Sequence, residues 1–548
     1  MKQGFIIFLI LVLGYNTLYS QSLLTKTEKL YATGKVWGFL KYYHPNVAKG
    51  MFNWDNELLQ ILPKVEQAKT KEDLSTLFTY WINSIGTVNE CKSCKTSKEV
   101  TYFDKNFDIS WTQDSTIFDI SLSQKLKFIE ENRFQGQSHY VSVNEKAGNI
   151  ILKNEQNYPD FDYQHENLRL LALFKYWNTI EYFFPYKYQA DKNWSMVLKD
   201  ILPKFLEAKN QLDYHLAMLE LVVSLDDSHA GLRTELLDNY FGLKFIPATF
   251  KIFEDGAVIT RFYNDSLANI NDIRVGDVIV KAEGKTIKEI FEKKSDYLKG
   301  SNESAKSAYA FDKIFNGSTD SIELEILRDN HLIKKRIGRY LFEQFKYSRP
   351  LRDKWKILDN NIGYVNLENV EIDDVSEISK VLRDTKSIIF DLRNYPKFTL
   401  SSFLEFLNPT PKEYAKAIVP DLEYPSKFYW QEPMILGENN RKHYQGKVII
   451  LVNSNTISYA ELYAMGLQTV NNSITIGSQT LGANGNVTGT EFLGGFKTGF
   501  SGIGIFYPDQ TETQRIGIRI DIEVKPTLEG IIQGRDEVLE KAIEVALK

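Results

Sequence analysis

The spacing of apolar residues divides the chain into a helical first half and later segments that are richer in strands. Apolar side chains recur every three to four positions within 21–98 and again within 165–240, which predicts amphipathic helices. Between them, residues 99–164 alternate more and carry β-branched residues, as at 117–122 and 140–143. This connecting region is therefore expected to contain a few strands.

Beyond these helices the pattern changes twice. Residues 241–340 combine short β-branched runs with glycine turns, which predicts a small β-rich domain. Residues 341–548 alternate strand and helix patterns, which predicts an α/β layered domain. Strands are expected at 362–367, 387–393, 447–452 and 473–477, of which 387–393 and 447–452 are expected to be buried. Helices are expected at 376–384, 458–468 and 536–547. The predicted fold class is multidomain, α+β and α/β.

The two helical segments share residues at a constant offset of 140 positions, and no insertion is needed to align them. The matched pairs are Trp37 and Trp177, Tyr42 and Tyr182, Pro45 and Pro185, Trp54 and Trp194, and the string Ile-Leu-Pro-Lys at 61–64 and 201–204. We interpret the segments as a duplicated helical module. The copies differ at one chemically important position, because the first has Asn89 where the second has His229.

Composition and charge narrow the class of protein. A chain of 548 residues is too long for one hydrophobic core, so about three or four domains are expected. The net charge of −5 gives no basic footprint for nucleic acid. Residues 1–20 have the pattern of a signal peptide, and no later run is apolar over 18 residues. An exported protein, periplasmic or extracellular, without stable membrane insertion is predicted.

Two cysteines, Cys91 and Cys94, are the only ones in the chain. No His or Cys cluster accompanies them, so a local disulfide is preferred over a metal site. A redox role would require a thioredoxin-like context, which the sequence does not show. The chain also has neither a Walker-type glycine loop nor an HExxH motif, and no cofactor or metal is predicted.

Ser458 is the first candidate for catalytic chemistry. It lies between the predicted strand 447–452 and the predicted helix 458–468. The free N–H groups at the start of a helix are suited to stabilise an oxyanion beside such a serine. The alternative is a serine that only caps those N–H groups. Glu461 has the spacing of a capping box and is expected to be structural.

His229 is the second candidate, because it occurs in only one copy of the helical repeat. It follows Asp226, Asp227 and Ser228, which offer several possible orienting partners for its ring. The alternative is a histidine that serves packing or lies at the surface.

The segment Val275-Gly-Asp277-Val-Ile-Val, followed by Gly284-Lys, resembles a PDZ domain. Such a domain implies binding of an extended peptide at the edge of a sheet. The alternative is a generic β domain that only positions its neighbours.

Together, the order of segments and the motifs of the last domain resemble the C-terminal processing, or tail-specific, serine peptidase family. The motifs are Ile362-Gly-Tyr-Val, Asp391-Leu-Arg393, Ser458 with Glu461, Gly477, and Asp521 with Gly534-Arg-Asp536. The resemblance covers roughly residues 165–548 and implies a crotonase/ClpP-like α/β peptidase core. The first helical module lies outside it.

The resemblance also discriminates between branches of this family. One branch uses a Ser-Lys dyad, but Ala483 occupies the position of the lysine here. The tricorn-core-like branch takes its histidine from a Ser-His pair before the PDZ-like domain, which Ser228-His229 matches. It also has a late acidic residue, for which Glu512 is the candidate and Gln514 the neutral alternative.

The resemblance implies that Ser458 attacks the scissile carbonyl while His229 transfers the proton. Ser228 and Glu512 are expected to orient the imidazole. The N–H groups of Tyr459 and Lys397 are expected to donate to the oxyanion. Asp391 and Arg393 are expected to be structural. The turn that contains Lys397 lacks the glycines of the family.

The predicted function is therefore a secreted serine endopeptidase, with the PDZ-like domain helping to dock an extended peptide or protein substrate. One alternative is an inactive peptide-binding protein on a peptidase scaffold, which the missing lysine and the glycine-free turn favour. Hydrolysis of a non-peptide ester by the same residues is another. The sequence makes no prediction of the oligomeric state.

Overall fold

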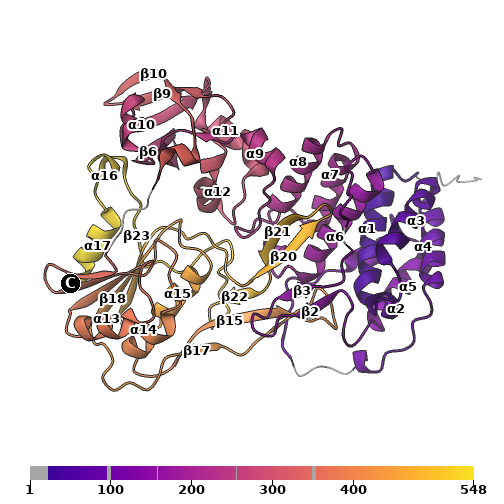
Figure 1. The fold of residues 1–548 in the computed structure, drawn as a ribbon. Helices are drawn as coiled ribbons and strands as arrows, with labels where there is room; N and C mark the ends of the chain where they lie inside the picture. The colour runs from indigo at the N-terminus through magenta and orange to yellow at the C-terminus, as the bar shows by residue number, and fades with distance from the viewer. Residues whose placement is uncertain (1–22, 96–99, 157, 255, 348–352) are drawn as a thin grey trace, which may run out of the picture.

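The computed structural model shows three regions in space: a helical half, a β-rich domain and a layered C-terminal domain (Figure 1). It describes residues 23–95, 100–156, 158–254, 256–347 and 353–548. The predicted signal peptide, 1–20, lies outside the described residues. Within the described ranges, no helix is both long and apolar enough to cross a membrane.

Two sets of helices form the first half, as the apolar spacing predicts. The first set is α1 (Lys26–Tyr43), α2 (Pro45–Ala48), α3 (Trp54–Gln67) and α4 (Lys71–Ser84); the second is α6 (Glu166–Phe183), α7 (Trp194–Leu206), α8 (Gln211–Val223) and α9 (Glu235–Phe241). In the first set, Trp37 Nε1 donates to the Trp54 carbonyl at 2.9 Å and Trp54 Nε1 returns a bond at 3.0 Å. Trp177 and Trp194 repeat this exchange at 2.9 and 3.1 Å.

The connecting region contains both strands and a helix. Its strands are β1 (Tyr102–Phe103), β2 (Val141–Val143) and β3 (Ile150–Leu152). β2 confirms the strand expected near 140–143 and pairs with β3. The strand expected at 117–122 is wrong, because the Asp119 side chain caps the start of helix α5 (Ile120–Glu131) and accepts from Leu122 N at 2.8 Å.

Residues 244–341 form the β-rich domain. Its strands are β4 (Lys244–Phe245), β5 (Ala248–Phe253), β6 (Gly256–Phe262), β7 (Val278–Ala282), β8 (Lys285–Thr286), β9 (Ser321–Arg328), β10 (His331–Gly338) and β11 (Tyr340–Leu341). The main sheet runs β10-β9-β7-β6-β5, with β8 beside β7 and every pair antiparallel. Helices α10 (Asp265–Ile270), α11 (Ile287–Lys294) and α12 (Glu303–Tyr309) accompany it. Among the described strands, β5 pairs only with β6, so its outer edge is open.

The C-terminal domain is built on a six-stranded sheet in the order β12-β13-β14-β18-β19-β23. These strands are β12 (Trp355–Leu358), β13 (Ile362–Asn366), β14 (Ser387–Asp391), β18 (Lys447–Val452), β19 (Ser473–Gly477) and β23 (Ile522–Glu523). Only the β12–β13 pair is antiparallel; the other four pairs are parallel. The four predicted strands are thus confirmed as β13, β14, β18 and β19.

Helices cover both faces of this sheet, as expected for parallel strands. On one face, residues such as Val448 and Ile450 pack with α13 (Asp374–Leu382), α14 (Leu400–Leu407) and α15 (Tyr459–Leu467). On the other face, Ile449 and Leu451 pack with α17 (Glu537–Ala546), which follows the short α16 (Leu528–Ile532). This alternation along β18 makes the α/β layers that the sequence predicts.

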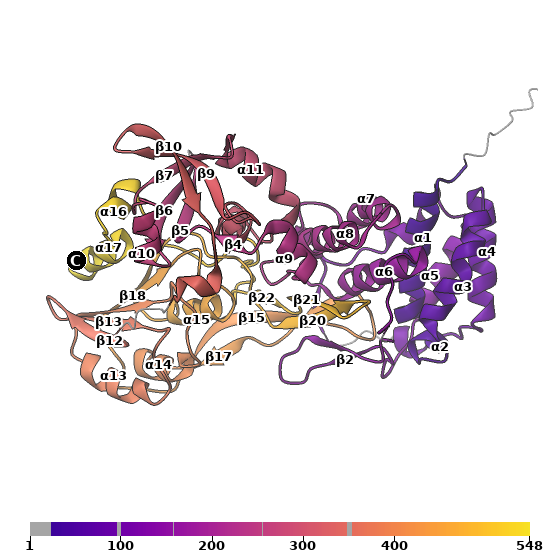
Figure 2. The same cartoon turned by 45° about the horizontal axis from the view of Figure 1, so that its top comes forward.

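A second sheet joins the C-terminal domain to the helical half. It consists of β15 (Lys412–Pro420), β16 (Phe428–Trp430), β17 (Met434–Leu436), β22 (Gly504–Phe506) and β1. The hairpin of β20 (Val487–Phe492) and β21 (Phe496–Ser501) extends toward α6 and α8 (Figures 1 and 2). There Phe492 stacks on Tyr176 with ring centroids 4.6 Å apart, and Phe496 meets His215 at 4.5 Å. The two halves consequently share one hydrophobic cluster.

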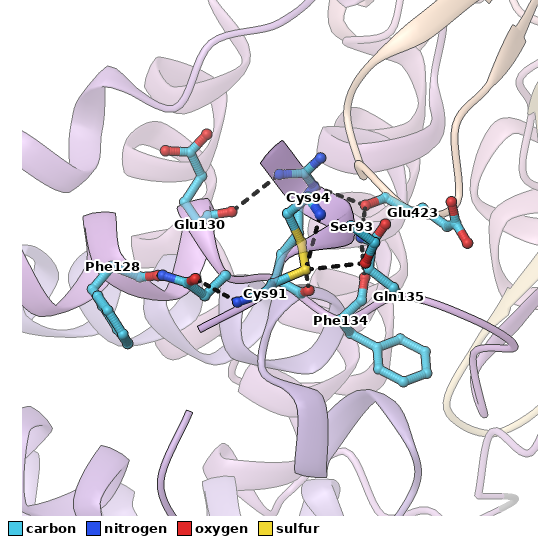
Figure 3. The surroundings of a disulfide bond; sticks show 10 residues. Cys91, Ser93, Cys94, Phe128, Glu130, Phe134, Gln135 and Glu423 are labelled. Carbon is cyan, nitrogen blue, oxygen red and sulfur yellow. Dashed lines mark hydrogen bonds between the residues drawn. A yellow bond between two sulfur atoms is a disulfide. The ribbon is translucent and has the colours of Figure 1, made fainter. Parts of the chain in front are cut away.

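Cys91 and Cys94 form the predicted local disulfide (Figure 3). The backbone of Cys91 donates to the Asn132 side chain at 2.8 Å. The neighbouring Arg133 and Gln135 both donate to the Glu423 carbonyl, at 2.8 and 2.9 Å. The disulfide therefore lies where the helical half contacts a loop of the C-terminal domain.

Gly477 ends β19 where β18 turns toward Ser458, and we expect Gly477→Ala to destabilise the protein. Its φ of +146° disfavours side chains, and an added Cβ would lie 1.9 Å from the Val452 oxygen. Such strain costs about 1–3 kcal/mol, and each kcal/mol lowers the thermal midpoint by about 2–4 °C in a domain of about 150–250 residues, the size of the C-terminal domain. Gly489→Ala is the matched control, because a Cβ there meets nothing within 4 Å. Equal midpoints for the two variants would contradict the expectation.

Candidate active site

Ser458 occupies a sharp turn between β18 and α15. Its φ of 58° and ψ of −121° differ from the extended conformation of ordinary N-cap residues. Its side chain makes no cap hydrogen bond to the helix. Because such a conformation is strained for a residue other than glycine, it is more typical of a functional position than of a cap.

The buried carboxylate of Glu461 holds this turn against a second one, residues 480–483. Its oxygens accept from Ser458 N at 3.2 Å, Gly482 N at 2.9 Å, Ala483 N at 3.1 Å and Thr480 Oγ1 at 2.5 Å. Ser458 N also donates to the Ala483 carbonyl at 2.9 Å. Burial raises the pKa of Glu461 to about 7, and these hydrogen bonds oppose the rise. The expected structural role of Glu461 extends beyond a capping box to both turns.

His229 follows α8, and its ring contacts Ser501, which in turn contacts Asp227. Its Nδ1 lies 2.8 Å from Ser501 Oγ at the end of β21. Ser501 Oγ lies 3.0 Å from Asp227 Oδ1, and Ser501 N donates to Asp227 Oδ2 at 2.7 Å. Asp227 also accepts from His229 N at 3.2 Å and from Gln514 Nε2 at 3.4 Å.

This chain of contacts assigns the tautomer of His229. A carboxylate only accepts hydrogen bonds, so the Ser501 hydroxyl donates to Asp227 and accepts from His229 Nδ1–H. Nε2 is then the unprotonated nitrogen that is able to take a proton. Burial lowers the pKa of His229 from its ordinary 6.5; nearby Asp227 opposes the shift and Lys299 adds to it. The imidazole is therefore neutral at pH 7.

Ser228 holds the backbone beside His229 and has no contact with the imidazole among the described residues. Its N donates to Ser301 Oγ at 2.7 Å, its Oγ accepts from Ser301 N at 2.9 Å, and its Oγ donates to the Leu481 carbonyl at 3.3 Å. The expected orienting role of Ser228 is corrected accordingly: it anchors the loop, while Ser501 contacts the ring.

Glu512 is the largest correction. Its carboxylate accepts from Lys105 Nζ at 2.8 Å, Tyr188 OH at 3.1 Å and Gln189 Nε2 at 3.0 Å. Within the described residues it makes no contact with His229; the acid that contacts Ser501 and the His229 backbone is Asp227. Gln514, the neutral alternative, is buried and reaches Asp227 rather than the ring.

The two expected oxyanion donors differ in availability. Tyr459 is the first residue of α15, and its N–H has no acceptor in the described part of the chain. The Lys397 N–H donates to the Leu367 carbonyl at 3.4 Å. It is therefore not available to an oxyanion in this conformation, contrary to the expectation. The Phe398 ring lies 4.8 Å from the Tyr459 ring, which keeps the glycine-free loop beside the start of α15.

The turn 480–483 lies between the two candidate catalytic residues. It binds Ser228 through the Leu481 carbonyl and Ser458 through the Ala483 carbonyl. No hydrogen bond joins Ser458 Oγ to His229 among the described residues. Catalytic hydrogen bonds are often long in unliganded enzymes and tighten when substrate binds.

Two cavities flank this region. One of about 890 Å³ is lined by Thr249, Phe250 and Lys251 of the open strand β5, and by the segment 453–455 before Ser458. The other, of about 790 Å³, is lined by His229. Tyr309 and Phe311 line both cavities, so the two cavities adjoin each other. Both volumes are large enough for a segment of peptide.

Asp391 and Arg393 form the expected structural pair. Arg393 Nε and Nη2 donate to Asp391 at 2.9 and 2.7 Å, and Nη1 and Nη2 donate to Asp536 at 2.6 and 2.9 Å. This fork joins the end of β14 to the start of α17. No group of three or more His, Cys, Asp or Glu side chains placed to hold a metal occurs in the described ranges.

Comparison with known proteins finds one family model that matches part of the last domain. Residues 361–524 match the model of peptidase family S41. No curated protein matches the chain in sequence. The solved structure of mature CPAF complexed with lactacystin is similar, with a TM-score of 0.55 and 14% identity over 70% of this chain and 98% of that chain. This likeness shows a shared fold.

Two further solved structures are more distant. A putative peptidase from Parabacteroides merdae has a TM-score of 0.45 and 15% identity, over 70% of this chain and 97% of that chain. The photosystem II D1 C-terminal processing protease has a TM-score of 0.40 and 15% identity, over 68% of this chain and 98% of that chain.

A fluorophosphonate probe is expected to label Ser458, and Ser458→Ala is expected to abolish the labelling. The rate should depend on neutral His229, so it should be full at neutral pH and fall as pH drops through the His229 pKa. Because burial lowers that pKa, the half-maximal rate should lie below pH 6.5. Labelling rates from pH 4 to 8, each checked for intact fold by circular dichroism, test this. A half-point above pH 6.5 would disprove the assignment.

Glu461→Gln is expected to lower both stability and probe reactivity. The amide replaces one acceptor oxygen by a donor that faces other buried donors, and each unsatisfied donor costs about 1–3 kcal/mol. The thermal midpoint and the labelling rate of Ser458 measure the two effects. Glu491→Gln, at an exposed position of the β20–β21 hairpin, is the control and should change neither. Wild-type values for Glu461→Gln would exclude a role in holding the turns.

Proposed function

We propose that this chain, whose residues 361–524 match the model of peptidase family S41, is an exported serine-type endopeptidase that uses Ser458 and His229. The observation that carries the proposal is the ordered chain from Asp227 through Ser501 to His229, which leaves Nε2 unprotonated. The adjacent Ser228 contacts the turn 480–483, which also holds Ser458.

In the proposed reaction, Ser458 Oγ attacks the carbonyl carbon of the peptide and His229 Nε2 takes the hydroxyl proton. The Tyr459 N–H donates to the oxygen that becomes negative. The C–N bond then breaks, and His229 gives its proton to the leaving amine. Water, deprotonated by the same imidazole, cleaves the ester on Ser458 and restores the enzyme.

Asp227 acts through Ser501 in this scheme. When His229 becomes an imidazolium, the buried carboxylate stabilises the positive charge from 3.8 Å, and the intervening hydroxyl relays the hydrogen bond. Asp227 and Ser501 are positioning residues, since neither reaches the reacting atoms.

The substrate is proposed to be an extended peptide that docks on the β-rich domain. Its open strand β5 lines the same cavity as residues 453–455, which lead to Ser458. Addition of a peptide strand to β5 would supply main-chain hydrogen bonds independent of sequence. The PDZ-like motif, with its Asp277 and Gly284 turns, supports this mode of binding.

Export and domain origin complete the proposal. Disulfides persist mainly in oxidising compartments, so Cys91–Cys94 supports export of the chain, as does the signal-like segment 1–20. The repeated tryptophan exchange at an offset of 140 residues supports an origin of the two helical modules by duplication.

A peptide-binding protein without turnover is the second candidate. Two observations favour it: the Lys397 N–H is engaged with Leu367, and Ser458 Oγ makes no hydrogen bond with His229 in the described structure. The two candidates differ in turnover. The wild type should cleave peptides from a quenched fluorescent library, and Ser458→Ala should not; binding by both without cleavage by either would support the second candidate.

The two acids Asp227 and Glu512 give the sharpest test of the relay. Asp227→Asn should lower kcat by at least about 10²-fold, because an amide cannot fix the Nδ1 tautomer through Ser501 or stabilise the imidazolium. Glu512→Gln should keep activity within about threefold, because its partners are Lys105, Tyr188 and Gln189. Steady-state cleavage of one quenched peptide by both variants measures this. The reverse order would restore Glu512 as the orienting acid.

A further inference from the structure

The cavity beside His229 contains an ammonium group without an anionic partner. Lys299 lines it, and within the described residues its Nζ makes no hydrogen bond or ion pair. Among the described residues, Nζ makes a cation–π contact with the Tyr309 ring, whose centroid lies 4.3 Å away. The side chain is half-buried. Burial lowers the pKa of Lys299, nearby Lys313 lowers it further, and Asp227 opposes the shift.

The acids that line this cavity are already bound to other cations. Asp312 pairs with Lys313 at 3.0 Å, and Asp238 forms a fork with Arg233 at 2.9 and 3.1 Å. Asp227, behind His229, accepts from Ser501, Gln514 and the His229 backbone. Partial burial makes an unpaired charge costly, so a carboxylate from outside the chain would be stabilised beside Lys299.

The position of the cavity indicates which part of a substrate reaches it. His229 gives its proton to the leaving amine in the proposed reaction, so the cavity that His229 lines faces the leaving fragment. The other cavity, with β5 and residues 453–455, receives the rest of the peptide. This step rests on the proposed function.

We propose that Lys299 binds a carboxylate of the substrate on the C-terminal side of the scissile bond. An ammonium and a carboxylate form a charge-assisted hydrogen bond, which is strengthened away from water. Lys313 and the exposed Lys497, which also line the cavity, add to the attraction for an anion. The carboxylate belongs either to an acidic side chain or to the C-terminus of a short leaving fragment.

Binding tests the proposal without turnover. Fluorescent peptides are titrated against the Ser458→Ala protein, in four forms: acidic or amide side chain after the scissile position, each with a free or amidated C-terminus. At least one carboxylate is expected to tighten binding by about tenfold, and Lys299→Met in the same background should abolish that difference. If tight binding is lost when the acidic side chain is replaced by its amide, Lys299 binds the side chain. If it is lost when the C-terminus is amidated, Lys299 binds the C-terminal carboxylate.

Cleavage provides the second measurement. In the wild-type background, Lys299→Met should raise KM for the preferred acidic peptide by about tenfold while leaving the neutral peptide within twofold, and Lys299→Glu should reverse the preference. Lys288→Met, on the exposed side of α11, is the matched control and should behave as wild type. Equal losses for acidic and neutral peptides, or no carboxylate preference in binding, would overturn the proposal.

The two proposals fail in different ways. Preferential binding of acidic peptides by Ser458→Ala, together with no cleavage by the wild type, would retain the role of Lys299 and reject the catalytic relay. Cleavage that depends on Ser458 and His229 but is indifferent to charge would retain the relay and reject Lys299 as an anchor.

Discussion

The arrangement of the site depends on one buried carboxylate. Glu461 accepts four hydrogen bonds, and in doing so joins the turn of Ser458 to the turn 480–483. The turn 480–483 also accepts a hydrogen bond from Ser228, the residue before His229. Because a carboxylate with four donors is fully used as an acceptor, neither turn can move without leaving buried polar groups unsatisfied. The proposed nucleophile, Ser458, and the residue before the proposed base, Ser228, are thereby held by the same short turn, 480–483.

The second constraint is the packing of the helical half on the C-terminal domain. Phe492 and Phe496 of the β20–β21 hairpin insert among aromatic residues of α6 and α8. The same hairpin ends at Ser501, which contacts His229. Hydrophobic burial at the tip of the hairpin therefore fixes a hydrogen bond at its base. The loop after α8 that carries His229 and the strand that carries Ser501 come together only when this interface forms.

Local patterns in the sequence were sufficient for much of the fold. Alternation and apolar runs located β13, β14, β18 and β19, because buried parallel strands have a strong local signature. The segment 117–122 failed, because the Asp119 cap reverses the preference of a short β-branched run. Ser458 was chosen from its place between a predicted strand and helix, and His229 from its absence in the first copy of the repeat. The family resemblance then joined the two in one proposed site.

The partners of His229 were harder to predict, since they depend on contacts over long separations. Ser501 is 272 residues from His229, and nothing in its immediate sequence marks it. Glu512 was chosen by its place in a family pattern, but Lys105, Tyr188 and Gln189 draw it elsewhere. Asp227 lies two residues before His229 and was one of the three neighbouring residues named as possible partners of its ring. It was thus the one partner that the local sequence could indicate.

The order in which the relay residues leave the ribosome has a consequence for the cell that makes this peptidase. Asp227 and His229 are synthesised first, Ser458 follows, and Ser501 comes last. In the proposed site, a nascent chain that has not yet reached Ser501 lacks the residue that orients His229. The proposed relay is therefore complete only after the whole β20–β21 hairpin has been synthesised and has packed on the helices.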